Sequence, residues 1–350
     1  MRLDLAALLG TALPIIQAPM AGVQGSALAI AVSQAGGLGS LPCAMLAPDA
    51  IAREVAAIRA ATDRPFNLNF FCHVPPEPDA AHEARWRERL ATYYAEYGID
   101  PAGIGAGAGR QPFSAALCNL VEPLRPPVMS FHFGLPSPEL LARVKSWGAR
   151  VLASATTVEE GLWLQAQGAD AVIAQGLEAG GHRGHFLSDD LSRQSGLFAL
   201  LPQLVAALEV PVIAAGAIAD AAGVSAAMAL GAAGVQVGTA YLLCPEATTS
   251  ALHRAALQSE AARHTALTRL FTGRPARGIV NRVMRELGPM SPDAPAFPLA
   301  TPAIAPLRAK AEAAGRGDFT PLWSGQNAAG CRPMPAGELT RTLAEGLGVR

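Results

Sequence analysis

Eight short apolar runs recur along this chain, and a helical or crossover segment follows each of them. Runs of this length, bounded by turn residues, indicate strands that are buried in a parallel sheet. Eight strand–helix units in succession predict an α/β protein built as a TIM (β/α)8 barrel. A doubly wound dinucleotide-binding fold is the alternative, but no Gly-x-Gly-x-x-Gly sequence follows the first run. The runs span residues 14–20, 38–42, 66–71, 128–133, 150–155, 171–175, 211–216 and 234–239.

Two stretches depart from this alternation. Residues 75–125 are longer than a simple crossover and contain proline-rich and charged segments, so we interpret them as an excursion inserted into the barrel. The alternation also ends after the eighth run, and residues 292–306 are rich in proline and predicted to be extended. We therefore expect a barrel over residues 1–245, and a cap with closing helices over the barrel mouth in residues 246–350.

Composition and charge narrow the classes of function. The chain has 350 residues, 51% of them hydrophobic, and a net charge of −1, so a large core is available and no electrostatic footprint for nucleic acid or an anionic membrane exists. No apolar run reaches the roughly 18 residues of a membrane span, and the first residues lack the core of a signal peptide. We expect a cytoplasmic monomer or homodimer that binds small molecules and neither nucleic acid nor membranes.

Cysteine and lysine usage disfavours two further kinds of chemistry. The five cysteines are widely scattered without Cys-x-x-Cys spacing, which predicts neither a metal site nor a disulfide framework. Lys145 and Lys310 are the two lysines of the chain, and both fall in predicted helices. A Schiff-base mechanism needs a desolvated lysine at a strand end, so the sequence disfavours it.

The stretch 175–185 follows the sixth run and carries four glycines between Gly176 and Gly184, together with His182. Glycine has no Cβ, so a backbone of this kind can approach a ligand closely. A histidine has an ordinary pKa of about 6.5 and can take or give a proton at physiological pH. We interpret His182 as a catalytic base or hydrogen-bonding group, with a purely structural glycine-rich turn as the alternative.

Uncharged polar groups mark other ends of the predicted strands. The amides of Gln17, Asn69 and Gln175 can both donate and accept, which suits the pyrimidine edge of a flavin. The loops after the seventh and eighth strands often hold phosphate in TIM barrels, and here residues 215–217 and 236–239 offer glycines, backbone N–H groups and a threonine hydroxyl. Close packing of helix and strand would also explain these glycines. Taken together, the three amides and the two glycine-containing loops favour a phosphorylated heteroaromatic cofactor.

Five motifs occur in order along the chain: QAPMAG at 17–22, SFHFGLP at 130–136, QGLEAGGHRG at 175–184, AAGAIAD at 214–220 and QVGTA at 236–240. They closely resemble the motifs of the nitronate monooxygenases, once called 2-nitropropane dioxygenases. The resemblance runs from about residue 14 to residue 282. It implies a TIM barrel that binds FMN.

The resemblance also implies roles for individual residues. His182 would be the base or hydrogen-bonding residue beside flavin N5, whereas His132 and Arg183 would bind the substrate, with Arg277 and Arg282 as further candidates to steer an anionic nitronate. No metal is implied. The family usually has glycine where this chain has Ala217, and residues 323–326 resemble a late family motif near the flavin. The implied FMN-binding residues are Gln17, Ala18, Pro19, Met20, Asn69, Gln175, Gly180, Gly181, Gly216, Ala217, Gln236, Val237, Gly238 and Thr239.

The implied reaction is the oxidation of alkyl nitronates, and also of nitroalkanes, by O2 to a carbonyl compound and nitrite without NAD(P)H. Two alternatives stay open at this point. The first is an NAD(P)H-dependent reductase of quinones or enoyl thioesters on the same fold. The second is a flavin-free barrel that binds or transforms a phosphorylated ligand.

Overall fold

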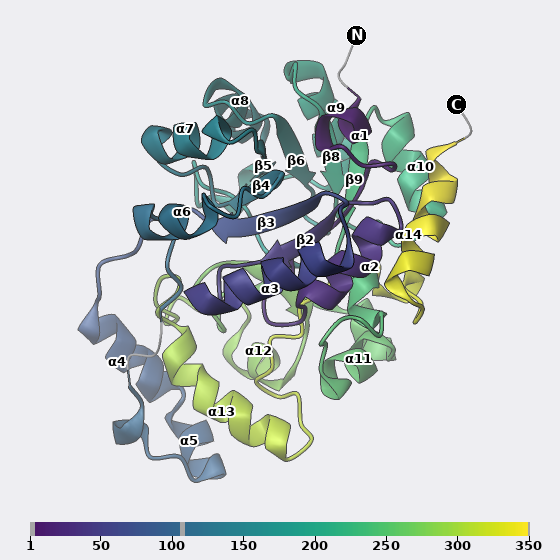
Figure 1. The fold of residues 1–350 in the computed structure, drawn as a ribbon. Helices are drawn as coiled ribbons and strands as arrows, with labels where there is room; N and C mark the ends of the chain where they lie inside the picture. Colours follow the sequence, from purple (N-terminus) through teal and green to yellow (C-terminus); the bar gives the residue numbers. More distant parts are fainter. Residues whose placement is uncertain (1–3, 106–108, 349–350) are drawn as a thin grey trace.

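Eight parallel strands form a barrel in the computed structural model, which describes residues 4–105 and 109–348 (Figure 1). In space they follow the order β1, β9, β8, β6, β5, β4, β3, β2, and a bridge between Ile16 and Leu38 joins the last strand to the first. The predicted TIM barrel is confirmed. The barrel strands are β1 (Ile15–Gln17), β2 (Gly39–Pro42), β3 (Phe66–Phe71), β4 (Val128–His132), β5 (Arg150–Ala155), β6 (Ala171–Gln175), β8 (Val212–Ala215) and β9 (Gly234–Val237).

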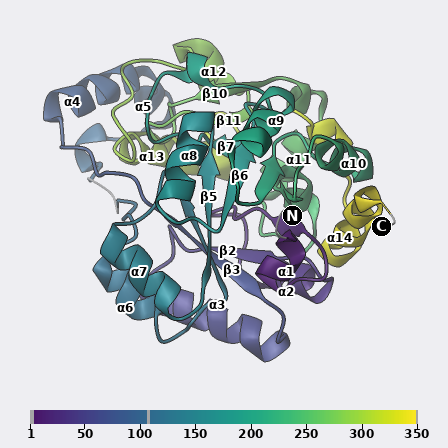
Figure 2. The ribbon, with the colours of Figure 1, turned by 90° about the horizontal axis from the view of Figure 1, so that it is seen from above.

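Helices surround the strands, as the view from above shows (Figure 2). Four of them begin where a side chain caps the helix: Ser114, Ser137, Thr157 and Asp220 each accept a hydrogen bond from the backbone N–H three residues further on. The apolar faces of the helices pack against the outside of the barrel. The flanking helices are α2 (Ser26–Gln34), α3 (Pro48–Ala61), α6 (Ala115–Val121), α7 (Pro138–Ser146), α8 (Val158–Ala166), α9 (Leu197–Ala207) and α10 (Ala221–Ala229).

Apolar side chains close the inside of the barrel at the amino-terminal end of the strands, and a buried polar group formed by Ser40, Asn67 and Ser130 lies within the barrel as well. Leu5 and Leu9 of α1 (Leu5–Leu9) belong to one buried cluster with Ile16, Leu152 and other inward-facing residues. Gly234 begins β9, and a Cβ there would lie 2.6 Å from Leu5 Cδ2. With this end filled, the carboxyl ends of the strands are the place for a ligand.

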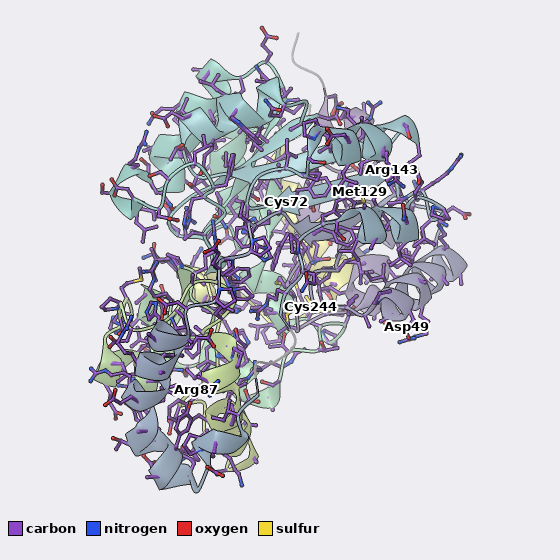
Figure 3. All side chains as sticks on the ribbon, turned by 90° about the vertical axis from the view of Figure 1, so that its left-hand side faces the viewer. Asp49, Cys72, Arg87, Met129, Arg143 and Cys244 are labelled. Carbon is purple, nitrogen blue, oxygen red and sulfur yellow. The ribbon has the colours of Figure 1, made fainter. Side chains whose placement is uncertain are left out.

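The excursion and the tail of the chain pack against each other and build the cap, which projects away from the barrel in Figures 1 and 3. Trp86 of α4 donates from its indole nitrogen to Ala300 O at 3.2 Å, and Tyr94 of α5 donates to Ala303 O at 2.7 Å. Both aromatic side chains lie in an apolar cluster with Phe319. The cap helices are α4 (Ala80–Arg89), α5 (Ala91–Tyr97), α12 (Arg282–Leu287) and α13 (Thr301–Ala313).

A second, three-stranded antiparallel sheet joins the cap to the barrel mouth. Its strands are β10 (Thr265–Thr268), β11 (Ala276–Ile279) and β7 (Gly181–His182), in the order β10, β11, β7. β11 pairs with β7 through Ala276 opposite His182 and Arg277 opposite Gly181. The sequence pattern predicts no strand in this region, because each of these strands is short and one face lies against the cap.

Two details of the tail differ from the sequence prediction. α13 begins at Thr301, inside the stretch 292–306 that was predicted to be extended, because Pro302 fits the first turn of a helix. α14 (Ala336–Ala344) buries Leu339 and Leu343 against the barrel helices α2 and α10 rather than over the barrel mouth. The remaining helices are α11 (Ala251–Leu257) and short 3-10 helices at Pro101–Gly103, Leu191–Arg193, Thr239–Leu243, Glu260–Arg263, Ala328–Gly330 and Glu345–Leu347.

Across the described part of the chain, no helix has both the length and the apolar character that crossing a lipid bilayer requires.

Candidate active site

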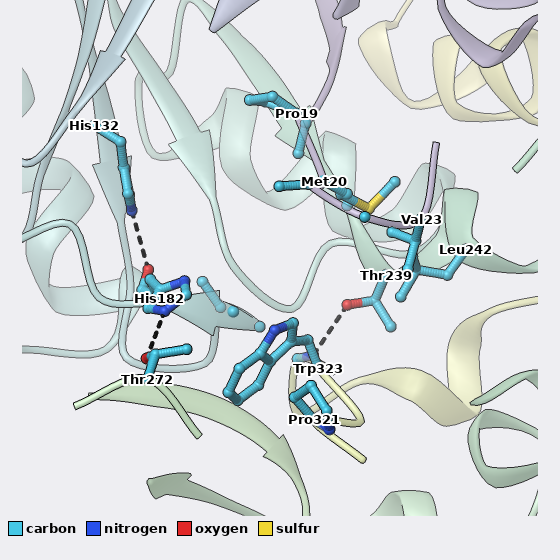
Figure 4. A pocket seen from close by; sticks show the side chains of 18 of the residues that line it. Pro19, Met20, Val23, His132, His182, Thr239, Leu242, Thr272, Pro321 and Trp323 are labelled. Atoms are coloured by element: carbon cyan, nitrogen blue, oxygen red, sulfur yellow. Dashed lines mark hydrogen bonds between the residues drawn. The ribbon is translucent and has the colours of Figure 1, made fainter. Parts of the chain in front are cut away.

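A cavity of about 350 Å³ lies at the carboxyl ends of the barrel strands, underneath the cap (Figure 4). Its walls come from the ends of six barrel strands, from β7, from α13 and from the segment 319–327. A cavity of this size is typical of a site for a cofactor or small molecule.

Most of the predicted site residues line this cavity. His182 and His132 lie on one side of it, and the glycine-rich loops at the ends of β8 and β9 lie on another. Five predicted residues are absent from the lining, namely Gln17, Arg183, Val237, Arg277 and Arg282. The predicted cofactor residues that do line it are Ala18, Pro19, Met20, Asn69, Gln175, Gly180, Gly181, Gly216, Ala217, Gln236, Gly238 and Thr239.

Gln17 and Val237 support the cavity from behind. The fully buried Gln17 accepts from Ser40 N at 2.9 Å and donates to Gln24 Oε1 at 2.7 Å, which ties β1 to β2. Val237 packs in the core, and its carbonyl accepts from Ala18 N at 2.8 Å. Both residues therefore position the loop 18–20, whereas the sequence pattern placed them in contact with the cofactor.

The amides at the cavity wall differ in how much of their hydrogen-bonding capacity is free. Asn69 donates to Ser130 Oγ at 2.9 Å. Gln175 is engaged at both ends, because its Nε2 donates to His182 O at 2.9 Å and its Oε1 accepts from Gly184 N at 2.7 Å. By contrast, the buried Oε1 of Gln236 has no hydrogen-bond partner within the described residues. An unpaired buried acceptor is costly, so Gln236 marks a place where a ligand donor would fit.

The loops after β8 and β9 adopt unusual backbone conformations and are held by the tail of the chain. Gly216 has φ +137° and Ala217 has φ +55°, a left-handed value that costs a residue with a Cβ on the order of 1 kcal/mol. Asn327 Nδ2 donates to Ala217 O at 2.9 Å, and Gly325 N donates to Thr239 Oγ1 at 3.0 Å. The segment that contains Gly325 and Asn327 therefore fixes both loops against each other.

His182 is held at three points beside the cavity, two of which Figure 4 draws. Its backbone carbonyl accepts from Gln175 Nε2 and from His132 Nε2, the latter at 3.2 Å. Its ring Nε2 lies 2.9 Å from Thr272 Oγ1 in the cap. The ring of Trp323 lies 5.6 Å away and that of Phe297 lies 5.4 Å away, between centroids.

Both histidines are neutral at physiological pH. Burial lowers the pKa of His182 well below its ordinary value, and the nearby Arg110 guanidinium and His132 lower it further. Burial also lowers the pKa of His132 to about 3. Because a carbonyl can only accept, His132 Nε2 carries the proton, and its Nδ1 accepts from Ser154 Oγ at 3.0 Å.

Arg183 does not reach the cavity, in contrast to the sequence prediction that it contacts substrate. Its fully buried guanidinium donates to Gln175 O at 2.8 Å, to Gly176 O at 2.7 Å and to Gln194 Oε1 at 2.8 Å, behind the loop. The side chain turns inward because these oxygens satisfy it there. The two other candidate arginines are also engaged elsewhere, Arg277 with Leu177 O at 2.8 Å and Arg282 with Glu96 at 2.7 Å.

The structure instead brings Arg110 to the cavity, a residue that sequence reasoning missed. Its guanidinium donates to Thr301 Oγ1 at 3.1 Å and lies 5.5 Å from the centroid of the Phe297 ring. Sequence reasoning also missed Thr272, which lines the cavity. Arg110 comes from the excursion and Thr272 from the cap, so no motif at a strand end could signal either residue.

The fold and the cavity together define a class of protein: a TIM barrel with a cavity large enough for a cofactor. The neutral imidazole of His182 faces this cavity. The family model described as nitronate monooxygenase matches residues 3–346. A nitronate monooxygenase of Paraburkholderia phytofirmans is 45% identical over 342 residues, which cover 96% of this chain and 92% of that protein. One from Pseudomonas aeruginosa is 44% identical over 345 residues, 97% of each chain. The chain belongs to the nitronate monooxygenase family and is an oxidoreductase.

Solved structures agree with this assignment. The crystal structure of a nitroalkane oxidase from Streptomyces ansochromogenes has a TM-score of 0.88 and 40% identity to this chain, covering 99% of this chain and 98% of that one. FabK from Thermotoga maritima is more distant, with a TM-score of 0.74 and 26% identity over 98% of this chain and 95% of that chain. The similarity thus extends over barrel and cap alike.

Proposed function

We propose that this enzyme binds FMN in the cavity and oxidises alkyl nitronates with O2 to a carbonyl compound and nitrite. The observation that carries the proposal is the neutral imidazole of His182, which is fixed at the wall of a cofactor-sized cavity by groups from both barrel and cap. The names of the relatives, nitronate monooxygenase and nitroalkane oxidase, support the choice of substrate.

The residues present fit FMN. The unpartnered Oε1 of Gln236 can accept from the N–H of the flavin pyrimidine, and the side chain of Asn69 lines the same cavity. The loops at 216–217 and 238–239 offer backbone and hydroxyl groups for the phosphate. When bound, FMN would take electrons from the substrate and pass them to O2.

Thr272 defines which nitrogen of His182 can act. In the proposed arrangement the Thr272 hydroxyl turns its hydrogen toward Arg274 O, 3.5 Å away, and its lone pair accepts from His182 Nε2–H at 2.9 Å. His182 Nδ1 then carries a lone pair and has no hydrogen bond within the described residues. This nitrogen can accept the α-proton of a nitroalkane, which leaves the carbanion as the nitronate. With a nitronate as substrate no proton is removed from carbon.

Arg110 supplies the positive charge that the anionic substrate requires. Burial lowers the pKa of its guanidinium, which stays protonated at pH 7 because arginine has a very high ordinary pKa. No ion pair joins Arg110 to a carboxylate within the described residues, so its charge is available to a nitronate that enters the cavity.

Aerobic turnover by the purified protein tests this function. We expect a yellow protein that releases nitrite from an alkyl nitronate without NAD(P)H and, with the neutral nitroalkane as substrate, a loss of roughly 10²- to 10⁴-fold in His182→Ala. Wild-type activity in that variant would remove His182 from the mechanism. Rapid anaerobic bleaching by NADPH, without nitronate turnover, would instead favour a reductase.

A further inference from the structure

A second cavity of about 560 Å³ lies beside the first, in the cleft between the barrel and the cap. Cys72, which Figure 3 labels, lies on its barrel side, and the turn between β10 and β11 lies on its cap side. Phe133 and Phe297 line it, and their rings lie 6.1 Å and 5.4 Å from the His182 ring between centroids. These two rings separate the second cavity from the active site.

Two guanidinium groups line this cavity without a carboxylate partner. Arg269 makes no side-chain hydrogen bond or ion pair within the described residues, although its Nε is buried. Arg274 donates from Nε to Arg183 O at 3.3 Å and from Nη2 to His185 O, and it lies 4.1 Å from the centroid of the Phe133 ring; it has no ion pair in the described structure. A buried donor without a partner indicates a place where a ligand acceptor would fit.

The remaining charges in the cavity do not neutralise the arginines. Asp189 is the one acidic residue among the described residues of its lining, and its side chain is 92% exposed. Burial lowers the pKa of Arg274 and Asp189 acts to raise it, but Asp189, which lies 3.3 Å from His185 Nε2, forms no ion pair with either arginine among the described residues. His73 is buried in the lining, and burial lowers its pKa to about 4, so it is neutral at pH 7. The cavity therefore carries a net positive charge.

The other walls are apolar and aromatic. Trp163 of α8 packs against Phe186 with 5.0 Å between ring centroids, and Leu135 and Phe297 complete this side. Guanidinium groups bind carboxylates through parallel hydrogen bonds, and aromatic walls accept the attached hydrocarbon. The combination fits an organic anion with a small charged head and a short apolar chain.

We propose that this second cavity binds a small aliphatic carboxylate through Arg269 and Arg274. Because Phe297 separates the two cavities and contacts the His182 ring, an occupant changes the packing behind His182 and lowers kcat without competing for the active site. The kinetic effect rests on the proposed function, whereas binding does not.

Calorimetric titration of the purified protein with butyrate tests the binding. We expect one site per chain, with affinity at least about tenfold weaker in Arg269→Gln and partly recovered in Arg269→Lys. Arg263→Gln is the matched control, because that exposed arginine pairs with Glu260 at 2.8 Å outside the cavity, and it should bind as the wild type does. Since Arg269 has no protein partner, its substitution should leave folding intact.

Two further measurements distinguish binding in the second cavity from binding in the active site. Butan-1-ol, which has the same chain without the charge, should not bind. Binding that is lost in Arg110→Gln but kept in Arg269→Gln would place butyrate in the active-site cavity and overturn the proposal, as would an absence of binding in the wild type. If butyrate binds as expected but no nitronate is turned over, the proposed function fails and the second site stands.

Discussion

The barrel rim and the cap contribute to the same active site in different ways. The rim provides backbone loops and side chains that follow directly from strand ends, such as Gly216 and Gln236. The cap provides Thr272 and Trp323, which reach the cavity only because the tail packs on the excursion. The barrel therefore creates the cofactor-sized space, whereas the cap holds the ring of His182 through Thr272 and covers the space.

The largest expected effect comes from loosening the cap. Trp86→Ala removes a fully buried indole from the cap cluster and should destabilise it by about 3–5 kcal/mol. Trp147→Ala on the barrel side is the control, because each indole donates to a backbone carbonyl at 3.2 Å. We expect flavin loss and proteolysis within the cap for Trp86→Ala, measured by absorbance and mass spectrometry. Equal flavin retention in both variants would contradict a closing role of the cap.

The contact between the glycine-rich loop and the tail gives the next effect. A Cβ at Gly180 would lie 2.5 Å from Gly325 N, so Gly180→Ala must push the tail away from the loop. At Gly181 a Cβ would meet nothing within 4 Å, although φ is +73°. We expect FMN affinity to fall at least about tenfold in Gly180→Ala and less in Gly181→Ala, measured by equilibrium dialysis. The reverse order would show that backbone strain matters more than the contact with the tail.

The barrel and the cap also differ in how far the sequence could predict them. The eight strands and the residues at their ends were predictable, because an apolar run and its flanking glycine are local signals. The roles of Gln175 and Arg183 were not, since both face partners from their own loop that a motif does not show. Arg110 could not be predicted at all, because it reaches the cavity through packing between segments almost two hundred residues apart.

A smaller effect is expected at Thr272. Thr272→Val removes the hydroxyl that holds His182 Nε2 but keeps the shape of the side chain. We expect kcat to fall roughly tenfold with KM nearly unchanged, because the favoured ring orientation and tautomer are lost. Thr272→Ser keeps the hydroxyl and should recover most of the rate. A shared loss in both variants would mean that packing, and not the hydrogen bond, is responsible.

A separate effect concerns pH. The pKa of His132 is lowered to about 3 and that of His73 to about 4, whereas both are about 6.5 in the unfolded chain. As the pH falls below about 6.5, the unfolded state binds protons that the folded state does not, so stability decreases between about pH 6.5 and pH 3. Thermal unfolding should show a Tm that drops over this window, and less so in His73→Phe. A flat Tm from pH 7 to pH 4 would contradict burial of neutral imidazoles.

The most direct test of the account is anaerobic mixing of the purified protein with an alkyl nitronate while flavin absorbance is followed. The account predicts a yellow protein whose absorbance falls within a single turnover and, with the neutral nitroalkane in place of the nitronate, a rate that is lower by roughly two orders of magnitude in His182→Asn. A colourless protein, or equal rates in the wild type and the variant, would contradict it.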